Sequence, residues 1–413
     1  MSKLEELIKE LCPDGVEFLA LEQVIHSLNT GLNPRKFFRL NTDDATNYYV
    51  TIREIHNNKI EFNDSTDRIN DEAMRLCNNR SNLEAGDVLF SGTGTIGETA
   101  LIAETPTNWN IKEGVYVLKP NTDKIVSKFL MYLLQSNFVC TAYMKKVAGG
   151  TVKSIPMKEL RKITIPVPPL PVQCEIVRIL DNFTELTAEL TAELTARKKQ
   201  YEYYRDTLLT FGDEVPSVTL GEIATDFYRG AGIKRDEVTA KGVPCVRYGE
   251  IYTSYDISFK KCVSHTKKDV VASPKFFEYG DIIFAITGES VEEIAKSIAY
   301  LGHEKCMAGG DTVVLKHKQE PRYLSYALST TAAQIQKSKG KVKSKVVHSS
   351  IPALKEIKIP LPDMKTQIRI ADILDNFHNL CNDISVGLPA EIEARQKQYE
   401  YYRDKLLDFK EIV

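Results

Sequence analysis

An octapeptide that occurs twice constrains this chain more than any other feature. Lys199 to Asp206 reads Lys-Gln-Tyr-Glu-Tyr-Tyr-Arg-Asp, and the same eight residues return unchanged from Lys397 to Asp404. Shorter matches precede both copies: Ile-Pro-x-Pro at Ile165 and Ile359, a glutamine at Gln173 and Gln367, and Ile-Leu-Asp-Asn-Phe at Ile179 and Ile373. A spacing of about 200 residues is too long for a solenoid, whose repeats run to about 20 to 50 residues. The repeat therefore predicts a duplicated domain, each copy followed by a linker.

Composition is consistent with two globular domains, each large enough to bury a core. The 413 residues are 43% apolar and 27% charged, with no apolar run long enough to cross a bilayer. Acidic residues interrupt the N-terminus where a signal peptide needs an apolar stretch, so we expect a cytoplasmic protein. The eight cysteines include no Cys-x-x-Cys pair, and we expect no metal site. A net charge of −2 argues against coating nucleic acid non-specifically.

Mixed α/β patterning fills the two regions that precede the repeated segments. After a short amphipathic helix that ends near Leu11, β-rich runs alternate with turns. The strands predicted are 48–52, 88–90 and 114–118 in the first region, and 243–248, 281–286 and 312–316 in the second. One helix is predicted in each region, over 127–146 and over 322–337.

Apolar residues at spacings of three and four predict two long helices, from about Ile176 to Phe211 and from about Ile370 to Leu406. The first contains Thr-Ala-Glu-Leu twice in succession, at 187–190 and 191–194, which adds a whole turn without breaking the apolar stripe. The second is expected to kink at Gly387–Pro389, because proline cannot continue a helical hydrogen-bond ladder.

The fold class predicted is α+β: two mixed α/β domains held apart by two long antiparallel helices, with an internal pseudo-twofold repeat. The expected boundaries are an N-terminal helix at 1–15, a first domain at 16–167, a central helical segment at 168–212, a second domain at 213–361 and a C-terminal helical segment at 362–413.

Gly92-Thr-Gly-Thr-Ile-Gly97 matches the Gly-x-Gly-x-x-Gly dinucleotide fingerprint as a string. The fingerprint needs a helix that opens at its third glycine, and Pro106 ends the segment too soon. A phosphate-binding Walker loop needs a lysine where this chain has Glu98. We therefore expect a strand followed by a tight turn, and a nucleotide-binding enzyme remains the competing interpretation.

Basic residues recur at equivalent places in the two domains, which points to nucleic acid. A glycine precedes a basic pair in each domain, Gly31 before Arg35–Lys36 and Gly230 before Lys234–Arg235, and a lysine-rich stretch precedes an Ile-Pro pair in each. Lysines neutralise phosphates and release counterions, and arginines at strand ends can read guanine edges or pair with a neighbouring glutamate. The candidate DNA-binding residues are Arg35, Lys36, Arg53, Lys145, Lys146, Gly150, Thr151, Lys153, Arg229, Lys234, Arg235, Arg247, Tyr248, Lys337, Lys339, Lys341, Lys343 and Lys345.

The arrangement resembles the specificity subunit of a type I restriction–modification system, and the Thr-Ala-Glu-Leu tetrapeptides are similar to those of the IC class. The resemblance covers the whole chain and is carried by the repeated helical segments. It implies that each α/β domain is a target-recognition domain reading one half of a split, asymmetric site in double-stranded DNA. It also implies that the helices bind two adenine-N6 methyltransferase subunits, and that this trimer recruits two ATP-driven translocase and nuclease subunits.

An amino-methyltransferase needs an Asn/Asp-Pro-Pro-aromatic motif, and this chain has none. We therefore expect it to select DNA without catalysing a reaction and to bind no cofactor itself, while the resemblance implies that its partners use S-adenosylmethionine, ATP and Mg²⁺. A coiled-coil scaffold without DNA contacts is a third interpretation. The octapeptides are the candidate partner-binding surface, through Tyr201, Tyr203, Tyr204, Arg205, Tyr399, Tyr401, Tyr402 and Arg403.

Overall fold

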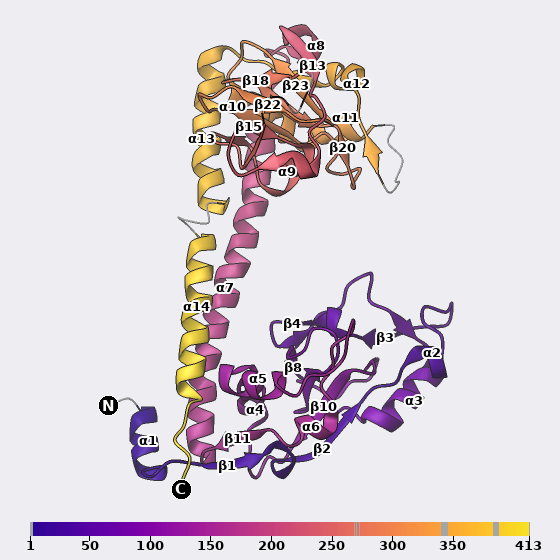
Figure 1. Ribbon diagram of the computed structural model, residues 1–413, viewed down its shortest axis with the longest axis vertical. Helices are drawn as coiled ribbons and strands as arrows, with labels where there is room; N and C mark the ends of the chain where they lie inside the picture. The colour runs from indigo at the N-terminus through magenta and orange to yellow at the C-terminus, as the bar shows by residue number, and fades with distance from the viewer. Residues whose placement is uncertain are drawn as a thin grey trace. The chain divides into compact units, whose positions relative to one another are not determined.

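The computed structural model describes residues 3–267, 269, 271, 273–339, 346–382 and 388–412. The chain forms two compact units. Unit 1 comprises Met1–Glu189 together with Ile392–Val413, and unit 2 comprises Leu190–Glu391. Each unit therefore combines one α/β domain with helical segments that come from both repeated parts of the chain (Figure 1).

Unit 1 is built around a four-stranded antiparallel sheet of order β2-β10-β7-β8. A second sheet, β6-β3-β9, has β3 parallel to β9, and β1 pairs with β11 where the domain meets the helices. Its elements are α1 (Lys3–Leu11), β1 (Glu17–Ala20), β2 (Ile25–Thr30), α2 (Pro34–Phe37), β3 (Asn47–Val50), β4 (Ile55–His56), β5 (Lys59–Ile60), β6 (Arg68–Ile69), α3 (Asp71–Ser81), β7 (Val88–Ser91), β8 (Thr99–Leu101), β9 (Trp109–Ile111), β10 (Val115–Pro120), α4 (Ser127–Gln135), α5 (Asn137–Met144), α6 (Met157–Leu160) and β11 (Thr164–Val167).

Unit 2 is also built on two main sheets, but each has five strands, in the orders β13-β23-β19-β21-β16 and β14-β17-β15-β22-β18. Its elements are β12 (Ser217–Thr219), α8 (Leu220–Ile223), β13 (Asp226–Arg229), β14 (Val238–Thr239), β15 (Val243–Val246), α9 (Tyr248–Thr253), β16 (Ser258–Phe259), β17 (Ser264–Thr266), β18 (Phe276–Phe277), β19 (Ile282–Ala285), β20 (Thr287–Gly288), β21 (Ser297–Tyr300), β22 (Cys306–Ala308), β23 (Thr312–Lys316), α10 (Pro321–Ser329), α11 (Thr331–Ser338), β24 (Val347–His348), α12 (Ile351–Lys355) and β25 (Lys358–Pro360). The central strands β7 and β19 are buried along their whole length, which explains why seven of their eight residues are apolar, Ser91 being the exception.

One detail of the predicted helices was wrong in both units. The helix expected over 127–146 is two helices, α4 and α5, and the helix expected over 322–337 is α10 and α11. Ser136 and Thr330 are extended at the two breaks, and each side chain accepts a hydrogen bond from a backbone amide of the helix that follows, at Val139 and Ala333. A hydroxyl that caps a new helix competes with continuation of the old one, and apolar periodicity does not register this competition.

The long helices are α7 (Leu170–Leu208), α13 (Met364–Asn382) and α14 (Leu388–Leu406). Within unit 1 the start of α7 runs antiparallel to α14, and Phe183 stacks on Tyr402 with ring centroids 5.4 Å apart (Figure 1). Within unit 2 the end of α7 runs antiparallel to α13, and Tyr204 stacks on Phe377 at 5.7 Å. The same aromatic pair is therefore made twice, once in each unit.

The kink expected at Gly387 lies outside the described residues. Helix α13 ends at Asn382 and α14 begins at Leu388. Pro389 lies in the first turn of α14, where a missing N–H costs no helical hydrogen bond.

The prediction of two mixed α/β domains with an internal repeat and a long helix is confirmed. No helix among the described residues is long and apolar enough to cross a membrane.

Candidate nucleic-acid and partner interfaces

In unit 1 the glycine motif and the lysine stretch come together. The backbone N–H of Gly94 donates to the carbonyl oxygen of Lys153 at 2.9 Å, and Thr93 forms a β-bridge with Ser154. Lys145, Lys146, Gly150, Thr151 and Lys153 are all exposed on the turn that this pairing supports. We call this turn, residues 145–153, the lysine turn of unit 1.

The three glycines of the motif serve packing and turn geometry. A Cβ on Gly92 would overlap the ring of Tyr116, and a Cβ on Gly97 would overlap the hydroxyl of Tyr143. Gly94 and Gly97 also have positive φ values, 85° and 104°, which favour glycine. Strand β8, rather than a helix, follows the motif. The strand-and-turn interpretation is confirmed, and the geometry offers no helix N-terminus for a dinucleotide phosphate.

Unit 2 makes the same pairing at the equivalent place. Strand β20 pairs with β24, and the N–H of Ser349 donates to the carbonyl oxygen of Ile286. The predicted lysines Lys341, Lys343 and Lys345 lie outside the described residues, whereas Lys339 is described and exposed.

Lys337 corrects the sequence prediction, because it is buried and unavailable to a phosphate. Its side chain is 4% exposed, and its Nζ donates to the carbonyl oxygen of Leu328 at 2.7 Å, with the Ser297 hydroxyl 3.5 Å away. Burial lowers the pKa of Lys337 to about 7. Lys337 is at the same step of α11 as the buried Tyr143 in α5, so this position faces the core in both units.

The two aligned glycines, Gly31 and Gly230, are explained by close backbone approach. A Cβ on Gly31 would overlap the carbonyl oxygen of Ile111, and a Cβ on Gly230 would overlap that of Gly309. The basic pairs that follow have exposed side chains at Lys36, Lys234 and Arg235, while the side chain of Arg35 is not described.

The predicted arginines at strand ends all have acidic partners. Arg53 pairs with Asp67 at 2.8 Å and remains half-exposed, and Arg229 pairs with Asp311. Arg247 is more covered and pairs with Glu250 at 3.0 Å; Tyr248, next in sequence, is partly exposed. Of the three arginines, Arg247 is therefore the one whose place at the end of the strand is explained by its ion pair with Glu250 rather than by DNA binding.

The repeated glutamines of the helical segments bind the start of the first domain helix, a role that the sequence analysis did not assign. Gln173 accepts a hydrogen bond from the N–H of Val126 at 2.8 Å, just before α4. Gln367 accepts one from the N–H of Glu320 at 3.1 Å, just before α10. The sequence signal for this role is that both glutamines occupy the same position of the repeat.

The repeated aspartates hold a tyrosine and a cation in each unit. Asp181 accepts from the Tyr132 hydroxyl at 2.7 Å and pairs with Lys128 at 2.6 Å. In unit 2, Asp375 accepts from the Tyr326 hydroxyl at 2.7 Å and pairs with Arg322 at 2.8 Å. Desolvation and the adjacent carboxylate raise the pKa of Tyr132 and Tyr326, so both remain hydrogen-bond donors.

The last residue of each octapeptide caps the second domain helix. Asp404 accepts from the N–H and the side-chain amide of Asn137, the first residue of α5, at 3.0 and 2.6 Å. Asp206 lies 3.4 Å from the N–H of Thr331, the first residue of α11. Arg403 and Arg205 pair with these aspartates, and their side chains are largely covered.

Four octapeptide residues predicted to bind a partner are therefore used within the chain. Tyr201 and Tyr399 are only 8% and 6% exposed and pack in the cores of units 2 and 1. Arg205 and Arg403 orient the capping aspartates. Packing within the chain therefore accounts for the arginine and the aspartate of each octapeptide, because the aspartate caps a helix N-terminus in each domain.

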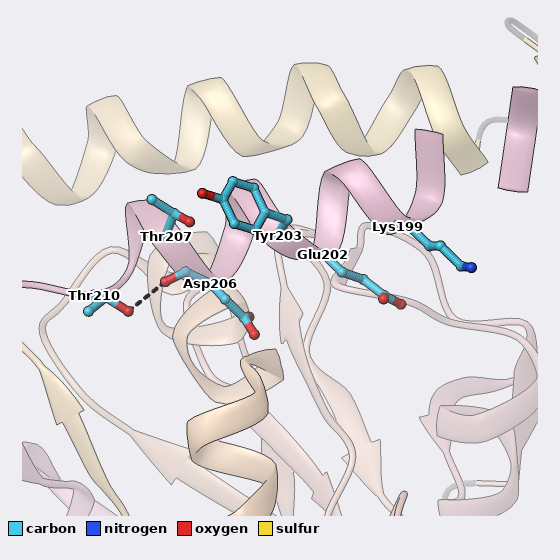
Figure 2. Close-up of a pocket in the computed structure, with 6 residues that line it drawn as sticks. All are labelled: Lys199, Glu202, Tyr203, Asp206, Thr207 and Thr210. Carbon is cyan, nitrogen blue, oxygen red and sulfur yellow. Dashed lines mark hydrogen bonds between the residues drawn. The ribbon is translucent and has the colours of Figure 1, made fainter. Parts of the chain in front are cut away.

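Tyr203 and Tyr401 are the most exposed tyrosines of the octapeptides, with exposures of 66% and 61%. Tyr204 and Tyr402 are half-exposed beside them. Around Tyr203 an open groove follows the end of α7 (Figure 2). It is lined by Lys199, Glu202, Tyr203, Asp206, Thr207 and Thr210.

The chain thus contains two α/β domains of one design, and each is bound in the same way by residues of the repeated helical segments. The family model described as the type I restriction modification DNA specificity domain matches the chain twice, over residues 13–197 and 213–394. The chain belongs to this family and is a type I restriction–modification specificity subunit with two target-recognition domains.

Individual relatives agree with this assignment. The chain is 37% identical to the EcoR124I/EcoR124II specificity subunit of Escherichia coli over 60% of its own length, and the match spans 63% of that subunit. It is 30% identical to a predicted type I restriction enzyme specificity subunit of Haemophilus influenzae, over 82% of this chain and 94% of the relative. Its fold is similar to that of one chain in a solved structure that concerns complex assembly and conformational transition of the type I R-M system, with a TM-score of 0.63. The match covers 96% of this chain and 98% of that chain at 19% identity.

Proposed function

We propose that each recognition domain reads one half of an asymmetric, bipartite site in double-stranded DNA. The observation that carries this proposal is the double match to a DNA specificity domain, one match for each half of the chain. Two domains of one design but of different sequence suit two half-sites of different sequence. The helical segments between and after the domains would then set the unspecified gap.

The exposed lysine turn of unit 1 supports a role in holding the duplex. Lys145, Lys146 and Lys153 project from a turn that β7 and the glycine motif support, so the turn is anchored to the core sheet. Phosphate contacts of this kind orient a protein on DNA without reading bases. Base reading then falls to other exposed side chains of the same domain, among which Arg53 and the basic pairs remain candidates.

We also propose that the Tyr203 and Tyr401 surfaces bind two methyltransferase subunits, which catalyse adenine-N6 methylation. Both tyrosines are exposed, whereas Tyr201, Tyr399 and the arginine and aspartate of each octapeptide are used within the chain, and tyrosine is enriched at interface centres. Identical surfaces in the two units suit two identical partners. The same complex would recruit translocase and nuclease subunits, as the EcoR124I relative is part of a restriction enzyme.

Methylation mapping tests the proposal. The chain and a methyltransferase partner are to be expressed together in a host that lacks adenine methylation, with the partner alone as control. We expect one new N6-methyladenine motif with two specified parts and a gap, present only when both proteins are present. A contiguous motif, or methylation by the partner alone, would contradict the bipartite assignment.

A further inference from the structure

A cluster of exposed basic side chains lies on unit 2, separate in sequence from the lysine-rich stretch 337–345. It consists of Lys260, Lys261, His303 and Lys305, all exposed, with the ring of Tyr279 stacked on His303 at 6.1 Å and nearly parallel to it. We call it the β21 patch, because the loop that follows β21 carries two of its members. None of its lysines has an acidic partner within salt-bridge distance among the described residues.

Backbone contacts make the patch a single surface. Phe259, which precedes the two lysines, accepts a hydrogen bond from the N–H of Leu301 at 2.8 Å, and a Cβ on Gly302 would overlap the carbonyl oxygen of Lys260. Gly280, next to Tyr279, donates to the carbonyl oxygen of Tyr300 at 2.9 Å. Three chain segments therefore bring these side chains to the same end of the sheet.

The repeat provides an internal comparison, because the same scaffold exists in unit 1 without the basic surface. Lys119 pairs with Glu84 and Asp87 in unit 1 as Lys316 pairs with Glu278 and Asp281 in unit 2. Where unit 2 has Tyr279 and His303, unit 1 has Ala85 and Thr105, which hydrogen-bond to each other. The fold does not require the β21 patch, so its charge has another cause.

The acidic groups near the patch are mostly neutralised. Glu278 is bound by Lys316, whose hydrogen bond, with a smaller effect from Lys305, lowers the pKa of this carboxyl. Glu304 is exposed between His303 and Lys305, and its backbone oxygen accepts from the Tyr300 hydroxyl. The surface therefore has a net positive charge and suits a polyanion.

The patch lies at the opposite end of β19 from the β20–β24 pairing, and the lysine-rich stretch precedes β24 in sequence. Residues 278–281 precede β19, whereas β19 leads directly into β20 and its pairing with β24. The four residues of β19 span about 13 Å at about 3.3 Å per residue. The β21 patch and the β20–β24 pairing therefore lie at opposite ends of this strand and do not form one continuous surface.

We propose that the β21 patch binds the phosphates of duplex DNA that flanks the half-site read by unit 2. This inference rests on the proposed function, since it needs the domain to lie on DNA. It makes the two recognition domains unequal: unit 2 holds DNA beyond its half-site through lysines that unit 1 lacks. A protein partner with an acidic surface is the competing occupant.

The test uses the assembled complex of this chain with its methyltransferase partner and two duplexes that carry the mapped site. One duplex ends at the unit 2 half-site, and the other extends 15 or more base pairs beyond it. The variant replaces Lys260, Lys261 and Lys305 by glutamine, and the matched control replaces the exposed Lys355, Lys358 and Lys365. We expect the patch variant to bind the long duplex more weakly, with a salt slope smaller by about 0.9 for each phosphate that the variant no longer neutralises, and to bind the short duplex like the wild type.

Two other outcomes would overturn the inference. Equal weakening on both duplexes would place the patch on the half-site and refute the flank assignment. Unchanged binding of both duplexes would refute a role in DNA binding and favour a protein partner. Failure of the wild-type complex to bind either duplex would refute the proposed function itself, and that result differs from failure of the inference alone.

Discussion

At the scale of single residues, burial decides whether a lysine can act on DNA. Lys337 stands in a lysine-rich stretch and is indistinguishable there from its neighbours, yet its ammonium points into unit 2 and donates to the end of α10. Lys145, Lys146 and Lys153 occupy the corresponding stretch of unit 1 and are exposed. Charge composition alone cannot separate these cases, because a side chain of this length can reach inward or outward from the same backbone.

Lys337 should make stability depend on pH. Its pKa in the folded protein is about 7, against about 10.4 in an unfolded chain, so the folded state binds fewer protons between these values. The free energy of unfolding should therefore rise with pH from about 7 to 10, by at most about 1.4 kcal/mol per pH unit. Below about pH 7 Lys337 is charged in both states, so the slope vanishes and the folded protein carries the full cost of the buried charge.

Replacing Lys337 by methionine should remove that slope, because methionine fills a similar volume without a charge. Denaturant unfolding at pH 7.5 and 9.5 would measure it, with Lys355→Met as the exposed control. We expect the stability difference between wild type and Lys337→Met to change by more than about 1 kcal/mol between the two pH values, and that of the control to stay constant. A constant difference for both variants would show that Lys337 is protonated in the folded protein.

At the scale of elements, the repeated helical motif is explained mainly by attachment of each domain to its helices. A glutamine and an aspartate from one segment bind the first domain helix, and the octapeptide aspartate from the other segment caps the second. Unit 2 repeats these contacts with Gln367, Asp375 and Asp206. The break between α4 and α5 at Ser136, and between α10 and α11 at Thr330, frees the amide that each octapeptide aspartate meets.

Two substitutions in the second octapeptide should separate folding from partner binding. Asp404→Ala removes the cap on α5 and should lower the free energy of unfolding by about 1 kcal/mol. Tyr401→Ala removes an exposed ring, and should leave stability unchanged while one methyltransferase copy is missing in native mass spectrometry. Asp408→Ala, an exposed change beyond the end of α14, is the matched control for both measurements. Retention of both partner copies by Tyr401→Ala together with Tyr203→Ala would move the partner site elsewhere.

At the scale of the whole molecule, α7 is the element that passes from one unit into the other. The helix is continuous from Leu170 to Leu208, and the change of unit falls between Glu189 and Leu190, inside the doubled Thr-Ala-Glu-Leu sequence. Four helical residues add about 6 Å and about 40° beyond a full turn. One base pair advances about 3.4 Å and rotates about 34 to 36°, given 10 to 10.5 base pairs per turn.

Deleting Thr191 to Leu194 should shorten the unspecified gap of the DNA site by one base pair and leave both half-sites unchanged. The rotation, which matches one base pair, is the stronger constraint, because a domain turned out of phase cannot face its groove. Methylation mapping of the deletion variant gives the gap directly. Altered half-site bases, or an unchanged gap, would rule out a helix that measures DNA.

The duplication, the α/β class of both domains, the long helices and the absence of a dinucleotide-binding turn could all be predicted from the sequence, because they depend on repeated residues, apolar periodicity and local turn chemistry. Which side of each motif faces inward became clear only from the folded chain. Tyr201 and Tyr203 belong to one octapeptide, yet the first is buried and the second exposed, and Lys337 is buried within a basic stretch. The physical reason is that burial and capping depend on segments far apart in sequence, such as Asp404 at the start of α5, and no local pattern encodes those neighbours.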